Sequence, residues 1–234
     1  GRYIVFVPDV MGEDVKQNAS ANRAKEWAEY NGTQTDFIPL EFWAEMYEGI
    51  NIANSIINRD FTPPTEVQDR YNQVVGQAYA IRGMAHFDLV RIFAQHYTFT
   101  AGATHLGVPI VTEYNVESKP PRNTVAEVYQ QVISDLEMGI SLMTIDPANA
   151  GYMSKEGAQA ILSRVYLYME DWANAEAQAT AVINSPRGFA LVSNANYPTM
   201  FYDGNSSEAI FEIVMTLPDN NGSDHIGGMY KETG

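Results

Sequence analysis

The sequence contains no cysteine, few basic residues and no long apolar run. Without cysteine, the chain has no disulfide, thiolate metal site or cysteine nucleophile, although this absence does not identify a cellular compartment. No stretch of 18 apolar residues and no basic-then-apolar leader is present, so the chain as given is expected neither to span a membrane nor to carry an address. With 14 basic against 29 acidic residues, the net charge of −15 repels nucleic acid and anionic lipid alike.

The 234 residues and the hydrophobic content of 45% indicate one large folded domain. Aromatic residues make up 12% of the chain, with 14 tyrosines and 10 phenylalanines, and asparagines are spread along its length. Aromatic rings and amides together suit ligands that combine apolar C–H faces with hydroxyl groups. The composition therefore favours neutral polyhydroxylated ligands.

Apolar residues recur at three- and four-residue intervals over most of the chain, which is typical of α-helices. The helices predicted from this spacing cover residues 40–59, 65–97, 124–143, 154–170 and 172–185. Thr65 and Thr124 are each followed three residues later by Gln or Glu, which is the capping-box pattern. Asp171 is the expected cap of the last helix.

The remaining segments are predicted to be long loops and a few short strands. Tyr3–Val7 is an apolar run that indicates a strand or an extended lead-in, and Phe189–Val192 and Ile210–Thr216 resemble strands. Residues 98–121 and 186–208 have no period and form long connections of the kind that often carries function. The predicted fold class is therefore mostly α with long loops.

An internal repeat is indicated by spacing. Tyr47 lies 35 residues before Arg82 and Tyr129 lies 35 residues before Arg164, so an offset of 82 residues relates the two pairs. This predicts equivalent helical pairs at about 40–97 and 124–185, in a tetratricopeptide-like α-α superhelix. Both arginines are expected to bind carbonyls or a carboxylate between helices. The alternative is a bundle without repeats.

At this point the sequence resembles the SusD/RagB family of outer-membrane nutrient-binding lipoproteins. The matching segments follow the family's order from about Trp43 to Ile213. They are Phe42–Tyr47, Ile50–Asn54, Gly76–Arg91, Gly107–Val111, Pro121–Tyr129 with Asp135-Leu136, Ser154–Leu162, Arg164–Tyr168, Asp171-Trp172 with Ala175, and Asn205–Ile213.

The resemblance implies a surface-exposed lipoprotein of the outer membrane that takes part in polysaccharide utilization. Such a protein binds oligosaccharide or polysaccharide without catalysis and passes it to a TonB-dependent, SusC-like transporter. Members of the resembled family have chains about twice as long as this one, and their chains begin with a lipidated cysteine. Residues 1–234 are therefore expected to be a single SusD-like domain that lacks the lipid anchor and the C-terminal half.

The candidate ligand residues are Trp27, Tyr30 and Asn31, in the polar, amide-rich stretch Asn22–Gln34. Sugar rings stack their C–H faces on aromatic rings, and amides bind their hydroxyls. In the resembled family, a loop just before the first matched helix contributes an aromatic platform, and Trp27 is the best candidate for that position. The alternative is a packed lead-in helix.

No catalytic centre, cofactor or metal site is indicated. The four histidines lack ligand spacing, and no second carboxylate stands at the separation that glycoside hydrolysis needs. The competing function is an intracellular tetratricopeptide scaffold that binds a peptide or protein partner in its groove. Long loops that carry Tyr114, Tyr197 and Tyr202 favour the glycan binder.

Overall fold

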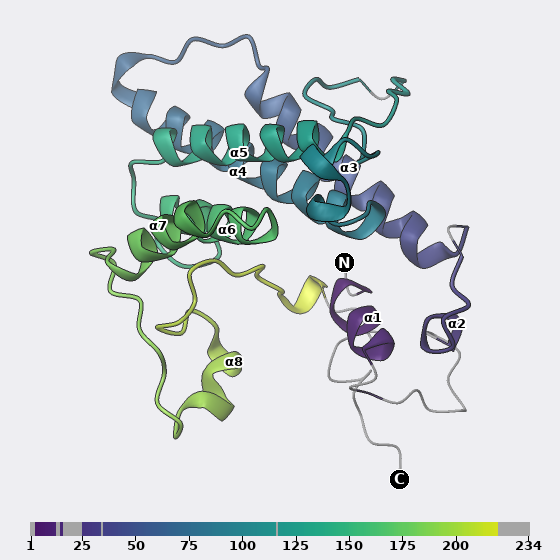
Figure 1. Cartoon of the computed structure of the whole chain (residues 1–234). Coiled ribbons are helices and arrows are strands. Elements are labelled where there is room, and N and C mark those ends of the chain that lie inside the picture. The colour runs from purple at the N-terminus through teal and green to yellow at the C-terminus, as the bar shows by residue number, and fades with distance from the viewer. Residues whose placement is uncertain (1–2, 13–14, 16–24, 34, 116, 220–234) are drawn as a thin grey trace. The chain divides into compact units, whose positions relative to one another are not determined.

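A computed structural model describes residues 3–12, 15, 25–33, 35–115 and 117–219. These residues are mostly helical (Figure 1), and the chain divides into two compact units, residues 1–45 with 215–234 and Met46–Val214. The α-helices are α1 (Tyr3–Met11), α2 (Lys25–Ala28), α3 (Phe37–Ile57), α4 (Gln68–Phe93), α5 (Val125–Leu142), α6 (Lys155–Tyr168), α7 (Trp172–Ile183) and α8 (Met200–Asp203). Short 3-10 turns are η1 (Thr65–Val67), η2 (Tyr97–Phe99), η3 (Ala101–Ala103), η4 (Tyr197–Thr199) and η5 (Leu217–Asp219). Among the described helices, none is both long and apolar enough to cross a bilayer.

Helices α3 and α4 form an antiparallel pair. The Tyr47 ring meets the edge of the His86 ring, with centroids 6.4 Å apart, and farther along α3 the Asn54 amide oxygen accepts a hydrogen bond from Arg82. The contacts move backward along α4 as they move forward along α3, which defines the antiparallel direction. Helices α3 and α4, which the segment with Pro63 and Pro64 connects, therefore pack as a helical hairpin.

Helix α5 lies against α4 at very short range, as Figure 1 shows. A Cβ atom added to Gly139 would lie 2.8 Å from the Gly76 carbonyl oxygen, and one added to Gly83 would lie 3.1 Å from the Asp135 side chain. Only glycine leaves room for backbones this close. The two glycines that interrupt the helical pattern of α4 thus mark its contact with α5.

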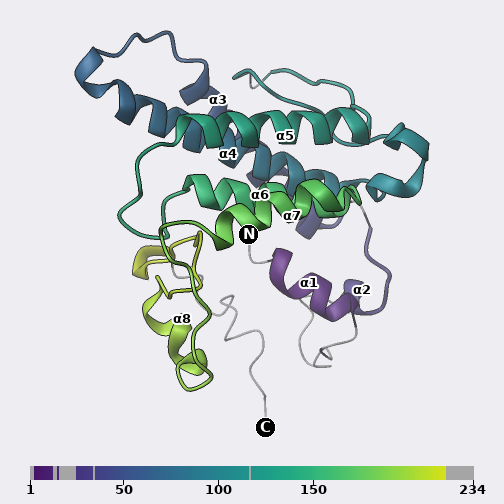
Figure 2. The ribbon, with the colours of Figure 1, turned by 60° about the vertical axis from the view of Figure 1, so that its left-hand side comes forward.

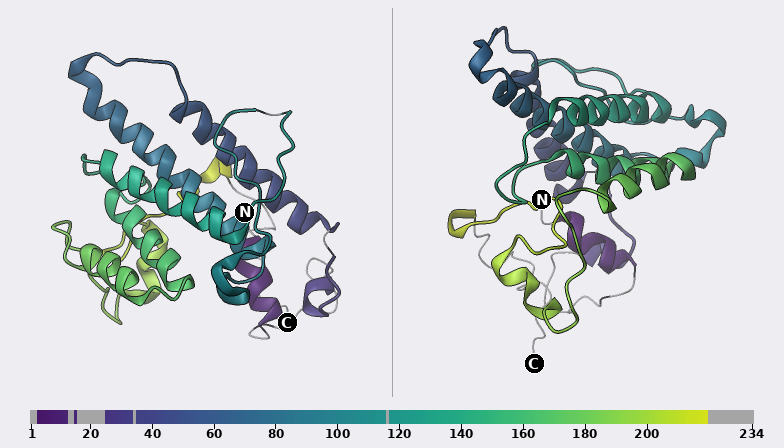
Figure 3. Two further views of the ribbon diagram at one scale, coloured as in Figure 1. Left: turned by 45° about the horizontal axis from the view of Figure 1, so that its top comes forward. Right: turned by 90° about the vertical axis from the view of Figure 1, so that its left-hand side faces the viewer.

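Helices α6 and α7 add the next hairpin to this array (Figures 2 and 3). Gln77 donates to the Met153 carbonyl just before α6, and Tyr168 at the other end of α6 packs edge-on to Phe87. Helix α6 therefore runs parallel to α4 and antiparallel to α5. The mostly α fold with stacked helical hairpins, predicted from the repeat spacing, is confirmed.

The helix starts illustrate how local sequence acts. Thr124 and Glu127 form the predicted reciprocal capping box, and Asp171 accepts a hydrogen bond from the Asn174 N–H as predicted. Thr65 does not cap a helix. It begins the 3-10 turn η1, and Val67, at the N-cap of α4, makes no side-chain cap hydrogen bond.

Three predicted elements are wrong in the described part of the chain. Tyr3–Val7 belongs to helix α1, because a short apolar run carries no period that separates strand from helix. Phe189–Val192 and Ile210–Thr216 form no regular secondary structure and join no ladder. Each instead donates single hydrogen bonds to loop carbonyls, from Ala190 to Ser207 and from Glu212 to Ala150.

The predicted single helix over residues 65–97 is shorter at both ends, since α4 begins at Gln68 and ends at Phe93. Ala94 is extended, with φ −130° and ψ 167°. The carbonyl oxygen of Phe93 accepts a hydrogen bond from Arg122. The carbonyl oxygen of Gln95 lies 3.1 Å from His105 Nε2. Groups distant in sequence therefore end this helix.

Candidate functional site

The three candidate ligand residues lie together in the first unit, around the short helix α2. Trp27 is part of α2, and Tyr30 and Asn31 follow in the turn that ends it. The Tyr30 and Asn31 N–H groups donate to the carbonyls of Trp27 and Glu26, respectively. One tight turn therefore brings an indole, a phenol ring and an amide close together along the chain.

Trp27 is half-buried, because its indole packs against the buried side chain of Ile38 together with Val7 and Val10. A Cβ atom added to Gly32 would lie 2.9 Å from the indole Cδ2, so the bare Gly32 backbone lies against the ring. The indole thus contributes to a small core, as the alternative of a packed lead-in helix expected. The rest of the Trp27 side chain is open to solvent.

Tyr30 and Asn31 are exposed, and the Tyr30 side chain is 61% exposed. Tyr30 has a positive φ of 56°, in the left-handed region that non-glycine residues seldom adopt. Its hydroxyl donates to the Met11 carbonyl at the end of α1, which fixes the direction of the ring. The phenol ring is consequently held in place while much of its surface is open to solvent.

In the second unit, the segment Gly107–Thr112 runs against α3 and α4, and side chains bind its backbone. Tyr47 donates to the Pro109 carbonyl at 2.8 Å, Asn54 to Val111 at 3.1 Å and Asn58 to Thr112 at 2.8 Å. Polar side chains of α3 and of the residue directly after it therefore bind this chain's own backbone. No local sequence pattern indicates these partners, because each hydrogen bond joins residues more than 50 positions apart.

His86 binds the same segment from α4. Its Nε2 accepts the Val111 N–H at 3.3 Å, and its Nδ1 lies 3.1 Å from the Arg82 carbonyl oxygen. Because a carbonyl only accepts, the hydrogen pattern assigns the proton to Nδ1 and makes the ring neutral. Burial lowers the pKa of His86 to about 4, which agrees with this neutral state.

The two arginines of the repeat differ in their surroundings. Arg82 is buried, where it binds Asp135 and Asn54 and also donates to the Thr112 carbonyl at 3.3 Å. This confirms the predicted structural role. Arg164 is half-exposed, with its guanidinium 3.6 Å from the Asp88 carboxylate.

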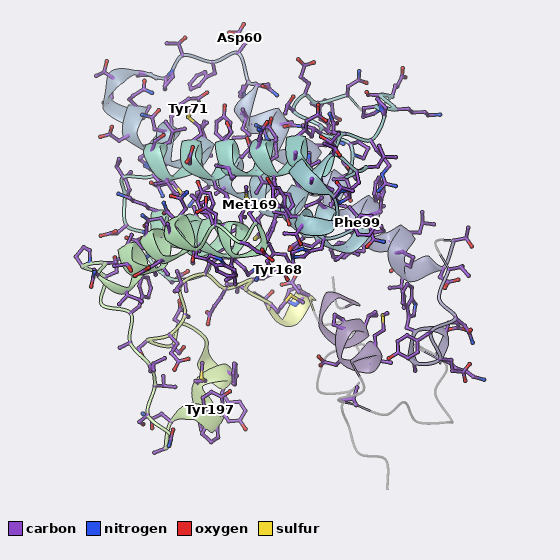
Figure 4. The ribbon with its side chains drawn as sticks, viewed as in Figure 1. Asp60, Tyr71, Phe99, Tyr168, Met169 and Tyr197 are labelled. Atoms are coloured by element: carbon purple, nitrogen blue, oxygen red, sulfur yellow. The ribbon has the colours of Figure 1, made fainter. Side chains whose placement is uncertain are left out.

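Several exposed aromatics of the second unit have no packing role that the helical period predicts. Phe99, labelled in Figure 4, is 63% exposed and meets His105 edge-on. Tyr197, in the segment after α7, contacts Phe201 with centroids 6.0 Å apart. The loops predicted to carry aromatics therefore present them at the surface.

Titratable side chains do not assemble into a metal site in the described part of the chain, where no group of three His, Cys, Asp or Glu residues stands close enough to bind an ion. The shifted pKa values have structural causes instead. Burial raises the pKa of the Asp135 carboxyl, opposed by hydrogen bonds from Arg82. Burial also raises the pKa values of Tyr47 and Tyr129, which lie between helices.

Stacked helical hairpins joined by long loops define a helical-repeat protein. A family described as starch-binding and associating with the outer membrane matches residues 3–167 of this chain. The chain belongs to the SusD/RagB family.

The chain is also similar to other proteins of this family. The curated SusD-like protein P2 of Formosa agariphila is 26% identical over 87% of this chain and 38% of its own length. A crystal structure of a putative sugar binding protein from Bacteroides vulgatus is 35% identical, with a TM-score of 0.80 over 89% of this chain and 48% of that one. A SusD superfamily protein from Bacteroides thetaiotaomicron is 31% identical, with a TM-score of 0.76 over 92% of this chain and 47% of that one. The chain thus spans less than half of the length of these relatives.

Proposed function

We propose that this chain is part of a non-catalytic, surface-exposed lipoprotein of the outer membrane that binds oligosaccharide or polysaccharide. The bound glycan would pass to a TonB-dependent, SusC-like transporter, and a lipid anchor outside this chain would hold the protein at the membrane. The observation that carries the proposal is the match of residues 3–167 to a family described as starch-binding and associating with the outer membrane. The solved putative sugar binding protein from Bacteroides vulgatus shares this fold.

The surface of α3 and α4 argues against the peptide scaffold. In such scaffolds, polar side chains of stacked helices bind the backbone of an extended partner peptide. Here Asn54, Asn58 and Arg82 already bind the backbone of Val111 and Thr112. The chain's own segment therefore occupies the position that a peptide partner would take on these helices.

We assign Trp27, Tyr30 and Asn31 to glycan contact. The support is the exposed phenol ring of Tyr30, which a hydrogen bond from its hydroxyl to the Met11 carbonyl holds in place. The exposed amide of Asn31 and the partly exposed indole of Trp27 lie close to it along the chain. Rings fixed before binding lose little entropy when a sugar stacks on them. The −15 net charge favours neutral glycans over sulfated or uronate-rich ones.

The test is glycan binding by the full-length protein in native affinity electrophoresis on a panel of polysaccharides that includes starch and laminarin. Laminarin belongs in the panel because a SusD-like protein of this fold, 22% identical over 80% of this chain, is a laminarin binder. Tyr30→Ala is expected to weaken binding about tenfold, because aromatic contacts of this kind contribute on the order of 1–2 kcal/mol. Retained binding in Tyr30→Ala and Asn31→Ala would refute the site, and hydrolysis of any bound glycan would refute the non-catalytic function.

Trp27 needs a stability control, since its indole packs on Ile38. Trp27→Phe keeps an aromatic ring in this core, whereas Trp27→Ala removes it. We expect Trp27→Ala to lose both glycan affinity and some stability, and Trp27→Phe to lose less of each. The transporter is tested separately, by co-purification of a barrel protein from detergent-solubilised outer membrane.

A further inference from the structure

We infer that Tyr114, with the amide of Asn115, forms a second glycan contact, on the loop between η3 and α5. This inference rests on the proposed glycan-binding function and adds to it a contact in the second unit. Figure 1 shows the loop, in teal, projecting beside the N-terminal end of α5. Three observations support it: the base of the loop is closed, its ascending stem is fixed, and its tip presents an open ring.

The base of the loop is closed by backbone pairing. Leu106 and Thr124 form an antiparallel bridge, and the Gly107 N–H donates to the Asn123 carbonyl at 2.7 Å. The Asn123 N–H returns a bond to the Val108 carbonyl at 3.2 Å, and Arg122 donates to the Gly107 carbonyl. The two ends of the loop are therefore held side by side.

The ascending stem is fixed by side chains of the helices. The carbonyls of Val111 and Thr112, the last residues before the tip, accept from Asn54 on α3 and from Asn58, the residue directly after α3. The Val111 N–H donates to His86 on α4. Thr112, which directly precedes Glu113, also accepts from Arg82 on α4 at 3.3 Å. The position of the tip is therefore set before any ligand arrives.

The tip combines the groups that recognise a neutral sugar. Tyr114 is 60% exposed, and its hydroxyl meets no hydrogen-bond partner among the described residues. Asn115 accepts the Glu117 N–H with its Oδ1, which leaves its amide N–H groups pointing elsewhere for a hydroxyl acceptor. A phenol face and an amide donor on a held loop suit the C–H face and the hydroxyls of a pyranose.

The charge at the tip of the loop disfavours anionic ligands. Glu113 directly precedes Tyr114 and Glu117 follows it three residues later, and these two exposed carboxylates outnumber the nearby Lys119, so the tip repels phosphate, sulfate and uronate groups. A peptide that added as a strand would need free backbone groups, but those of Val111 and Thr112 are already bonded to helix side chains. A neutral glycan remains the ligand that fits.

The experiment compares Tyr114→Ala with Tyr152→Ala in the full-length protein. Tyr152 is the matched control, because it is 56% exposed on another loop of the same unit. Both are assayed by native affinity electrophoresis and calorimetry on the polysaccharide panel that includes starch and laminarin. Tyr114→Ala should lose about fivefold to tenfold in affinity, with an unchanged melting temperature, and Tyr152→Ala should bind as the parent does.

Asn58→Ala tests the positioning of the loop. Asn58 is exposed, and the hydrogen bond from its side-chain amide to the Thr112 carbonyl lies outside the core. The variant should therefore keep its melting temperature and lose about twofold to threefold in glycan affinity. The double variant with Asn58→Ala and Tyr114→Ala should bind glycan as weakly as Tyr114→Ala alone, because the ring that Asn58 positions is already absent.

The outcomes separate this inference from the proposed function. If the parent binds glycan and Tyr114→Ala binds equally well, the Tyr114 contact is wrong while the proposed function stands. If Tyr114→Ala keeps glycan affinity but no longer co-purifies a barrel protein, the loop contacts a protein partner and the inference is again wrong. If the parent binds no glycan of the panel, the proposed function and this inference both fail.

Discussion

Arg82 and Asp135 form a buried, bidentate salt bridge between α4 and α5. The guanidinium Nε lies 2.9 Å from Oδ2 and Nη2 lies 2.6 Å from Oδ1 of the carboxylate. Nη1 of the same guanidinium donates to Asn54 on α3, and Gln131 donates to Asp135 at 2.9 Å. One arginine therefore joins three helices and, through the Thr112 carbonyl, the stem of the loop.

Asp135→Ala should destabilise the protein by about 3–5 kcal/mol, because it leaves the buried guanidinium without its counter-charge. The free energy of unfolding is measured by urea denaturation at pH 7. The exposed pair Lys25–Glu29 supplies the control, and Lys25→Ala should change stability by less than about 0.5 kcal/mol. Equal effects of the two variants would mean that Arg82 finds solvent or another partner when Asp135 is absent.

His86 should make stability depend on pH in a defined window. Its folded pKa of about 4 lies below the unfolded value near 6.5, so the unfolded state binds the proton first as pH falls. The contribution is complete above about pH 6.5 and declines by about 3 kcal/mol as pH falls to about 4. His86→Gln should show a shallower decline over this window, because glutamine does not titrate.

The comparison of His86→Gln with the parent is made by urea denaturation at half-unit pH steps. Subtraction removes the contributions that the two proteins share, including that of Asp135, whose pKa burial raises. Identical slopes between pH 4 and 6.5 would show that His86 is protonated or solvent-accessible in the folded state. At pH 7 the variant should also be less stable, since the edge contact of the buried imidazole with the Tyr47 ring is lost.

Two glycine substitutions should have opposite signs. In Gly139→Ala the new Cβ would lie 2.8 Å from the Gly76 carbonyl oxygen and 3.2 Å from the Ala80 Cβ, so α4 and α5 must separate. Overpacking of this kind costs about 1–3 kcal/mol. Gly49→Ala on α3 meets no atom within 4 Å and should stabilise by about 0.5–1 kcal/mol through helix propensity.

Thermal unfolding of the two variants beside the parent measures both effects. A melting temperature that falls for Gly139→Ala and rises for Gly49→Ala agrees with the short distance between α4 and α5. A neutral or stabilising Gly139→Ala would show that the two helices are farther apart than the structure has them.

Thr124→Ala should cost about 1 kcal/mol, because the Glu127 N–H at the start of α5 loses its side-chain acceptor at 3.2 Å. Hydrogen bonds from Thr124 lower the pKa of Glu127, so the stabilisation is present above the unfolded pKa and is lost as pH falls through the folded one. Urea denaturation at pH 7 and near pH 3 measures this difference. Ser141→Ala, whose hydroxyl bonds only to Met138 one turn before, is the control and should be nearly neutral.

The predicted ligand residues show how far local patterns reach. The sequence placed Trp27, Tyr30 and Asn31 in a polar stretch without an apolar period, and they do lie in one short helix and its turn. The packing of the indole on Ile38 was not predictable, because it depends on a residue eleven positions away whose burial no local period signals. Whether these residues bind glycan stays a prediction.

The sequence by itself determined that the second unit is mostly helical, and it determined where α5 and α7 begin. Apolar spacing, the Thr124–Glu127 pattern and Asp171 are local signals, and each acts within one or two turns of the chain. The tertiary structure alone decided where α4 ends, that residues 189–192 and 210–216 pair with no strand, and which backbone groups Asn54, Asn58 and His86 bind. These features depend on hydrogen bonds between segments far apart in sequence, and a backbone group gives no sign of its distant partner until the helices that carry that partner have packed.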